Sequence, residues 1–223
     1  MKHSFKFASY ALTVCFFISS FAHSLTKQEQ LIQSLYDIGV FKFGNFTLKS
    51  GKNSPFYIDM RMIICHPEIL EQVADCLDQM ITEEYDYVCG VPYSGLIIAT
   101  ALSLKTRLPL LLKRKEAKDY GTKKMVEGNF LPGDRCLVIE DVITTGQSIL
   151  ETTSVLENEG LIIADVIVLI DRQESGVAHV ARKGHNVTAV LTLTEIALYL
   201  HTQRLISTQE FENMTNAITT SSH

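Results

Sequence analysis

The chain has 223 residues, of which 46% are hydrophobic and 20% charged, a composition typical of a globular protein with one hydrophobic core. Its formal net charge of −5 argues against a general nucleic-acid or membrane-surface binder, because such proteins are more often basic. The five cysteines show no CxxC or metal-ligand spacing, so we interpret them as small buried hydrophobes: Cys15, Cys65, Cys76, Cys89 and Cys136.

Residues 1–24 have the pattern of a secretory signal. Lys2 and Lys6 precede an apolar run over residues 7–18, and small residues follow up to Ala22. The run is shorter than the roughly 20 residues that a membrane-spanning helix needs. A start codon assigned too early would produce the same kind of extension. We therefore expect an extension over 1–24, one domain over 25–210 and a polar C-terminal tail over 211–223.

The first part of the domain contains two helical patterns and a hairpin pattern. Hydrophobic spacing predicts a helix over residues 27–38, with Thr26 as its cap. Two strand-like runs flank residues 50–55 and predict a hairpin. An amphipathic helix is expected over residues 66–81, with Pro67 in its first turn.

From residue 85 onward, short apolar strands alternate with helices. We expect strands over residues 85–91, 108–112, 136–139, 161–170 and 187–193. Helices are expected over residues 96–105 and 149–159, and Thr194 is expected to cap a C-terminal helical stretch. This alternation predicts an α/β fold, with a mostly parallel central sheet flanked by helices on both faces.

Polar segments follow four of these strands. Ligands of such sheets bind outside the carboxyl ends of the strands, which predicts one rim carrying residues 93–95, 113–115, 140–148 and 171–172. The longest polar stretch, residues 113–128, has six basic residues between Lys113 and Lys124. A long polar excursion in a compact domain is often a functional lid. Taken alone, the stretch fits a solvated surface loop better.

The clearest motif is LVIEDVITTGQSI, residues 137–149. An apolar strand runs into Glu140 and Asp141, which we expect at the strand end, and the next residues turn into a helix. Gly146 permits a tight turn, and backbone N–H groups at a helix start form an anion site with the helix dipole. The carboxylates accept hydrogen bonds and suit ribose hydroxyls or the water of a metal. The motif fits a sugar-phosphate site and a solvated, acid-capped loop equally well.

Other motifs for phosphate binding or hydrolysis are incomplete. Gly90 and Gly95 have P-loop spacing, but Leu96 stands where that motif needs a lysine. The sequence has no GxGxxG, HExxH or GxSxG motif. The sequence therefore lacks the motifs needed for nucleotide hydrolysis, zinc proteolysis or serine esterase chemistry.

The segment VIEDVITTGQS resembles the phosphoribosyl-diphosphate signature of type I phosphoribosyltransferases. The segments FTLKSGKNSPFYID, GVPYSG, RKEAKDYGTKKMVEG and LIDRQESG resemble orotate phosphoribosyltransferases, including that domain of bifunctional UMP synthase, over roughly residues 25–204. The resemblance implies a type I phosphoribosyltransferase fold with a small N-terminal hood and a flexible active-site loop. The decarboxylase half of UMP synthase would need another domain, so we expect a monofunctional enzyme.

The activity that the resemblance implies is a phosphoribosyl transfer in UMP biosynthesis. The phosphoribosyl group of 5-phospho-α-D-ribose 1-diphosphate would pass to orotate, giving orotidine 5′-monophosphate and diphosphate. The resemblance makes Arg114, Lys118 and Asp119 catalytic. Phosphoribosyl diphosphate would be bound by Lys49, Tyr93, Ser94, Arg114, Lys115, Lys118, Tyr120, Glu140, Asp141, Val142, Ile143, Thr144, Thr145, Gly146, Gln147 and Ser148. Orotate would be bound by Tyr57, Ile58, Thr144 and Arg172.

Arg172 allows a chemical check of this assignment. A forked guanidinium suits the carboxylate of orotate better than an ammonium group does. The alternative is a strand-end ion pair between Arg172 and Asp171. The sequence also departs from the common family pattern: Ser94, Tyr120 and Glu140 stand where many relatives have lysine, histidine and aspartate.

The resemblance further implies a cofactor and partners. Magnesium is expected, bound mainly through the substrate diphosphate and without a metal site of the protein's own. A homodimer is expected, with loop 113–128 completing the partner's site, and neither nucleic acid nor membrane as a partner. Phosphoribosyl diphosphate is a cytosolic metabolite, so we expect a cytoplasmic protein.

Two other functions stay open. One is a non-catalytic phosphoribosyl-fold regulator, which retention of Arg114, Lys115, Lys118 and Asp119 argues against. The other is a phosphoribosyltransferase for a different base, which Arg172 and the hairpin motif disfavour.

Overall fold

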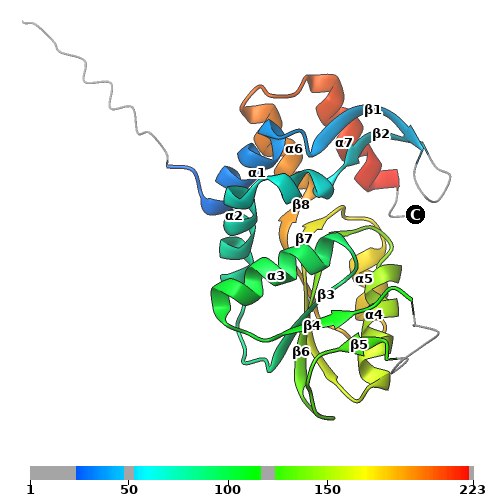
Figure 1. The fold of residues 1–223 in the computed structure, drawn as a ribbon. Coiled ribbons are helices and arrows are strands. Elements are labelled where there is room, and N and C mark those ends of the chain that lie inside the picture. Colours follow the sequence, from blue (N-terminus) through cyan, green and yellow to red (C-terminus); the bar gives the residue numbers. More distant parts are fainter. Residues whose placement is uncertain (1–23, 48–52, 117–123, 221–223) are drawn as a thin grey trace, which may run out of the picture.

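The computed structural model describes residues 24–47, 53–116 and 124–220, which form an α/β fold around a six-stranded sheet (Figure 1). The sheet has the order β5-β4-β3-β6-β7-β8. Its strands are β3 (Tyr87–Gly90), β4 (Leu110–Lys113), β5 (Val126–Glu127), β6 (Arg135–Ile143), β7 (Ile162–Asp171) and β8 (Val187–Thr192). All neighbours pair in parallel except β5, which is antiparallel to β4. The predicted mostly parallel sheet is confirmed.

Helices cover both faces of the sheet, which explains why its strands read as continuous apolar runs (Figure 1). Leu137 and Ile139 of β6 point into one core cluster, which includes residues of α2 (Pro67–Asp78) and α3 (Ser94–Thr106). Cys136 and Val138 point into the other, with residues of α4 (Gln147–Asn158) and α5 (Gly176–Ala181). All four side chains are fully buried. The strand is therefore apolar at every position of this run.

A second layer of structure lies beside the carboxyl ends of β7 and β8 (Figure 1). It consists of α1 (Lys27–Asp37), the antiparallel hairpin β1 (Phe41–Thr47) and β2 (Asn53–Ile58), α6 (Leu193–Thr202) and α7 (Thr208–Thr220), while the 3-10 helix η1 (Met60–Cys65) leads into α2. Tyr36 Oη donates to the carbonyl oxygen of Leu205 at 2.7 Å, and Tyr199 Oη donates to Gln33 Oε1 at 3.1 Å. These bonds tie α1 to α6 and to the segment that follows α6.

The C-terminal boundary predicted at residue 210 is wrong for the described residues. Residue 210 lies inside α7, and Met214 of that helix is fully buried in the core. The helix has a mostly polar sequence, but it packs against β2 and α6, and most of its described side chains are partly or fully buried. Residues 211–220 therefore belong to the folded domain. The extension predicted over 1–24 lies, apart from Ser24, outside the described residues.

Local details also differ from the predictions. β6 continues through Glu140 and Asp141 to Ile143, so the acid pair lies within the strand and not after it. Thr192, not Thr194, caps α6, because its side chain accepts from the Glu195 backbone N–H in a capping box. The short elements β5, η1 and α5 were not predicted.

Three of the cysteines confirm the buried interpretation. Cys76, Cys89 and Cys136 are buried, and burial raises the pKa of the Cys89 thiol to about 11. Cys65 is exposed on η1, which contradicts that interpretation for this residue, and Cys15 lies outside the described ranges. Across the part of the chain that the structure describes, no helix is both long enough and apolar enough to cross a membrane.

Candidate active site

The predicted rim forms where three parallel strands end side by side. Val91, just after β3, donates its backbone N–H to the carbonyl oxygen of Ile139 in β6 at 2.8 Å. Arg172, just after β7, donates its backbone N–H to the carbonyl oxygen of Ile143 at the end of β6 at 3.2 Å. The segments after β3, β6 and β7 therefore meet at one edge of the sheet, as predicted.

The turn from β6 into α4 is the segment predicted to be an anion cradle. Gly146 adopts a left-handed φ of +76°, and α4 begins at Gln147, whose backbone N–H donates to Thr145 Oγ1 at 3.4 Å. A Cβ at Gly146 would lie 2.5 Å from Val180 Cγ2 of α5, so the turn also needs glycine for its packing. The next backbone N–H groups in the first turn of α4 point out of the helix end, as an anion site requires.

The acid pair has one buried and one partly exposed member. Glu140 is only 4% exposed, and its Oε2 accepts a 2.6 Å hydrogen bond from Ser148 Oγ in the first turn of α4. Burial, followed by the charge of Asp141 and hydrogen bonding with its carboxyl group, raises the pKa of Glu140 well above its usual range. Asp141 is partly exposed. Asp141 is thus the more accessible of the two carboxyl groups.

The two glycines with P-loop spacing serve close packing. A Cβ at Gly90 would lie 2.3 Å from the carbonyl oxygen of Gly95, and one at Gly95 would lie 2.7 Å from that of Ile139. The first turn of α3 therefore sits directly against β3 and β6. This contact brings Ser94 and Tyr93 to the rim, where Tyr93 is 67% exposed.

Two basic residues after β4, Arg114 and Lys115, contact different parts of the structure. Lys115 Nζ lies 5.3 Å from the centre of the Tyr93 ring, at the rim. Arg114 Nη1 instead forms a 3.0 Å ion pair with Glu127 Oε1 of β5, and its Nε is buried without a hydrogen-bond partner among the described residues. Of the other predicted ligands, Lys49, Lys118, Asp119 and Tyr120 lie outside the described residues.

Arg172 is buried at the rim, with its side chain 7% exposed. Its Nε donates to Glu174 Oε1 at 2.9 Å, and its guanidinium carbon lies 4.7 Å from the centre of the Phe56 ring. The alternative partner, Asp171, instead accepts a 2.7 Å hydrogen bond from the backbone N–H of Gln173. Burial, and to a lesser extent the charge of Glu174, raises the pKa of Asp171. The expected alternative ion pair with Asp171 is not formed.

The remaining predicted residues divide between core and surface. Ile58 and Ile143 are buried in the two core clusters. Tyr57 is partly exposed, and its ring centre lies 5.8 Å from that of Phe46 on the hairpin. Partly exposed Val142 and Thr144 lie at the end of β6 and just after it, while Thr145 and Gln147 are exposed in the turn and first turn of α4.

Three residues at the rim were missed by sequence reasoning: Phe56, Glu174 and His179. Phe56 and Glu174 contact Arg172, and His179 Nδ1 of α5 lies 2.9 Å from the carbonyl oxygen of Thr145 in the cradle. Phe56 and Glu174 belong to the quoted segments FTLKSGKNSPFYID and LIDRQESG, which is the signal that could have found them.

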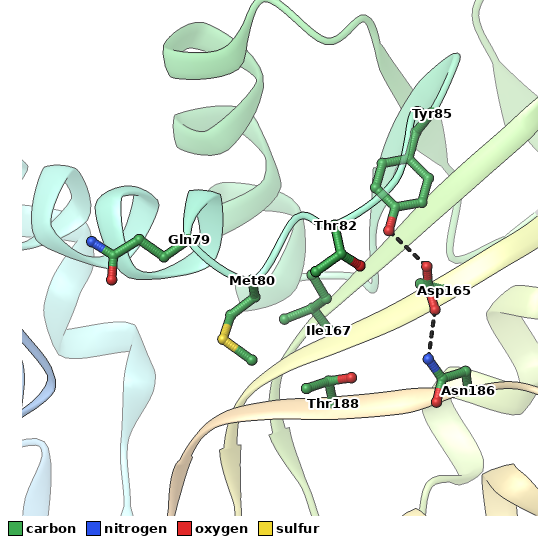
Figure 2. Close-up of a pocket in the computed structure, with 8 residues that line it drawn as sticks. All are labelled: Gln79, Met80, Thr82, Tyr85, Asp165, Ile167, Asn186 and Thr188. Atoms are coloured by element: carbon green, nitrogen blue, oxygen red, sulfur yellow. Dashed lines mark hydrogen bonds between the residues drawn. The ribbon is translucent and has the colours of Figure 1, made fainter.

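A cavity of about 160 Å³ lies toward the opposite ends of the strands (Figure 2). Asp165 accepts hydrogen bonds from Tyr85 Oη at 2.6 Å and from Asn186 Nδ2 at 2.7 Å in its wall. Asp165 and Thr188 lie near the starts of β7 and β8, whereas Arg172 follows the end of β7. The cavity is thus separate from the rim.

A metal ion held by the protein alone would need several acidic, histidine or cysteine side chains close together. Within residues 24–47, 53–116 and 124–220, no group of three or more histidine, cysteine, aspartate or glutamate side chains is placed to hold one. A magnesium ion that travels with a diphosphate needs only one or two protein carboxylates, with water and phosphate oxygens as its other ligands. The partly exposed Asp141 fits such a minor role.

Known proteins similar to this chain are phosphoribosyltransferases or contain a phosphoribosyltransferase domain. The family model of the phosphoribosyl transferase domain matches residues 61–189. The chain is 46% identical over 187 residues to uridine 5′-monophosphate synthase of Bos taurus, covering 82% of this chain and 39% of the relative. It is 40% identical over 178 residues to orotate phosphoribosyltransferase of Caenorhabditis elegans, covering 78% of each.

A solved structure of UMP synthase from Leishmania donovani matches the fold with a TM-score of 0.81 at 32% identity. The match covers 86% of this chain and 42% of that one. The chain thus spans about two fifths of the length of these UMP synthases and most of the length of the nematode orotate phosphoribosyltransferase.

Proposed function

This chain belongs to the phosphoribosyl transferase domain family, in its orotate phosphoribosyltransferase branch, and from that premise we propose that it transfers a phosphoribosyl group to orotate. The observation that carries the proposal is the buried guanidinium of Arg172, a residue whose backbone pairs with the end of β6, the strand that leads into the turn before α4. A forked cation suits a ligand with a carboxylate, and a helix start suits a phosphate. Orotate and phosphoribosyl diphosphate supply those two groups, and the reaction belongs to pyrimidine biosynthesis.

The proposed reaction makes specific demands on the rim. A bond forms between N1 of orotate and C1 of the ribose, while the bond from C1 to the diphosphate breaks. The ribose becomes cation-like and the departing diphosphate gains negative charge, so the site needs fixed positive charge and must exclude water.

The residues at the rim match these demands. We assign the 5′-phosphate to the backbone N–H groups at the start of α4 and the ribose hydroxyls to Asp141 and Glu140. We assign the diphosphate to Lys115, Arg114 and Lys118. Arg114 would exchange its ion pair with Glu127 for the diphosphate. Magnesium, when bound with the diphosphate, would offset part of its charge, with Asp141 as a protein ligand.

The direct test is an activity assay. The protein would be incubated with orotate, phosphoribosyl diphosphate and magnesium, and the loss of orotate absorbance followed. We expect turnover, formation of orotidine 5′-monophosphate and no reaction when uracil or adenine replaces orotate. Absence of orotate turnover by folded protein, with activity on another base, would contradict the assignment.

The proposal includes a homodimer in which residues 113–128 of one copy complete the partner's site. In this proposal the second copy would cover Met62 and Ile64 of η1, which are 37% and 48% exposed. Light scattering should give the mass of two chains. A fully active monomer would contradict this part of the proposal.

We also propose that the protein works in the cytoplasm, where phosphoribosyl diphosphate is made. Cell fractionation should recover the activity with the cytoplasmic proteins. Recovery from the periplasm or medium of a chain cleaved after Ala22 would contradict it.

A further inference from the structure

Arg172 does not offer all five of its N–H donors to a ligand. Its Nε donates to Glu174 Oε1 at 2.9 Å, which removes the donor pair formed by Nε and one Nη from use by a ligand. Neither terminal nitrogen, Nη1 or Nη2, has a hydrogen-bond partner among the described residues. Both keep some contact with solvent. The free edge of the guanidinium is therefore the one that carries both Nη groups.

The turn that carries this ion pair is fixed at three points. Gln173 has a left-handed φ of 56°, which is unusual for a residue other than glycine and brings Glu174 back toward Arg172. Gln173 Oε1 accepts from both the backbone N–H and the hydroxyl of Thr194, at 2.8 and 2.6 Å. Asp171 Oδ1 accepts from the Gln173 N–H at 2.7 Å. A strained conformation held by several contacts indicates that the position of the side chains around it matters.

Phe56 fixes the guanidinium from another direction. This side chain is 2% exposed, comes from β2 of the hairpin and has its ring centre 4.7 Å from the guanidinium carbon. A cation over an aromatic ring is held by the ring quadrupole, and a flat guanidinium also stacks well on it. Arg172 thus contacts the hairpin through Phe56 and its own turn through Glu174.

We propose that Glu174 is a positioning residue that, together with Phe56, leaves only the two Nη groups of Arg172 to meet the carboxylate of the pyrimidine ligand end-on. The inference rests on the proposed function, because it takes orotate as the ligand. Glu174 also balances the buried charge of Arg172 when no ligand is bound, and an unpaired buried cation would be costly. The specificity for a carboxylate on the base therefore depends on a residue that does not touch the base.

The test compares two ligands that differ only in this carboxylate. Orotidine 5′-monophosphate carries it and uridine 5′-monophosphate lacks it. Binding of each to the wild type, Glu174→Gln and Glu174→Ala would be measured by calorimetry. Glu174→Ala should weaken binding of orotidine 5′-monophosphate by about 10-fold or more, the effect of one hydrogen bond to a charged group, and leave that of uridine 5′-monophosphate within about 2-fold. Glu174→Gln, which keeps an acceptor oxygen, should fall between the wild type and Glu174→Ala.

Controls separate positioning from general damage. Glu83 forms an ion pair with a different arginine, Arg135, which is the first residue of β6. Glu83→Ala should change the binding of neither nucleotide. Phe56→Leu keeps an apolar side chain, removes the ring and should weaken only orotidine 5′-monophosphate. Equal weakening of both nucleotides by Glu174→Ala, or no weakening of either, would overturn the inference. If the wild type fails to prefer orotidine 5′-monophosphate and to use orotate, the proposed function itself has failed.

Discussion

Ser148 Oγ donates a 2.6 Å hydrogen bond to Glu140 Oε2 and so ties the first turn of α4 to β6. The bond occupies the hydroxyl proton of Ser148, so an anion at the start of α4 would be bound by backbone N–H groups and not by this hydroxyl. It also places an uncharged donor against a carboxyl group that is almost fully buried. The acid pair and the phosphate cradle are therefore one connected structure.

The first prediction concerns Glu140→Gln. The pKa of Glu140 is raised by burial and by Asp141, so the folded state binds this proton more tightly than the unfolded state does. Ionisation of Glu140 therefore lowers the free energy of unfolding as pH rises from the ordinary pKa toward the folded one. Glu140→Gln cannot ionise, and it should be more stable than the wild type at pH 8 but not at pH 4. Urea unfolding at the two pH values measures this, and equal stability differences would contradict it.

The same substitution should lower activity. A carboxylate beside the ribose stabilises its cation-like transition state and accepts from its hydroxyls, and an amide does so less well. We expect kcat/KM to fall about tenfold or more, the value of one hydrogen bond to a charged group. Unchanged kcat/KM would remove Glu140 from the ribose site.

The second prediction is that Gly146→Ala damages the cradle. The new Cβ would lie 2.5 Å from Val180 Cγ2, and φ is +76°. Strain and overpacking together should cost about 1–3 kcal/mol of stability and raise the KM for phosphoribosyl diphosphate. Gly184→Ala is a matched control, because φ there is +95° but no atom lies within 4 Å of the new Cβ. Equal effects of the two substitutions on KM would contradict a role for the close packing at Gly146.

The sequence predicted those features that depend on pattern and topology. Apolar strands buried on both faces identified the sheet, and the rule for carboxyl ends brought the segments after β3, β6 and β7 to one rim. The end of β6 was misplaced because Glu140 and Asp141 were taken as a stop signal. The ladder with β7 uses backbone groups and continues from Glu140 opposite Val168 to Ile143 opposite Asp171, whatever the side chains.

The partners of Arg172 could not be predicted from local sequence. Glu174 meets it only because Gln173 takes a left-handed conformation, which three contacts with other residues support. Phe56 comes from a hairpin that is distant in sequence. Such side-chain contacts depend on tertiary packing, which the periodicity of hydrophobic residues in the sequence does not reveal.

The third prediction concerns Asp59, a buried carboxylate between two cations. Arg61 Nε lies 2.7 Å from one of its oxygens and Lys42 Nζ 2.9 Å from the other. The hydrogen bond from Arg61, with a further one from Lys42, lowers the pKa of Asp59 from 3.8 to about 2 against the opposing effect of burial. The stabilisation is therefore complete above pH 4 and is lost as pH falls toward 2.

Asp59→Asn should lower the free energy of unfolding by about 1–2 kcal/mol at pH 7. This value is reduced to allow for the solvent exposure of the two cations. The difference from the wild type should shrink between pH 4 and pH 2 in urea unfolding. Asp75→Asn is the control, because Asp75 pairs with Lys105 at 2.7 Å but both side chains are more than a third exposed, so the pair should contribute at most about 1 kcal/mol. A cost for Asp59→Asn that does not change with pH would rule out the charge as its cause.

The fourth prediction is that Arg172→Ala acts on orotate and not on phosphoribosyl diphosphate. Loss of a buried charged hydrogen-bonding partner costs about 2–5 kcal/mol, so kcat/KM for orotate should fall about 30-fold or more. The KM for phosphoribosyl diphosphate should change little. Arg135→Ala, which removes an arginine paired with Glu83 on an exposed surface, should alter neither constant. An unchanged kcat/KM for orotate would refute the carboxylate role of Arg172.

The last prediction joins Lys118 to the dimer. Lys118→Ala should lower kcat about 100-fold or more, because it removes a positive charge that meets the departing diphosphate. If Lys118 acts in the partner's site, the Lys118 and the Arg172 of any one site come from different chains. In a heterodimer of Lys118→Ala with Arg172→Ala, one site then carries both defects and the other carries neither. Refolding an equal mixture should therefore restore about a quarter of the wild-type sites, since half of the dimers are mixed. If Lys118 acted within its own chain, every site would keep one defect and the mixture would stay as inactive as its parents.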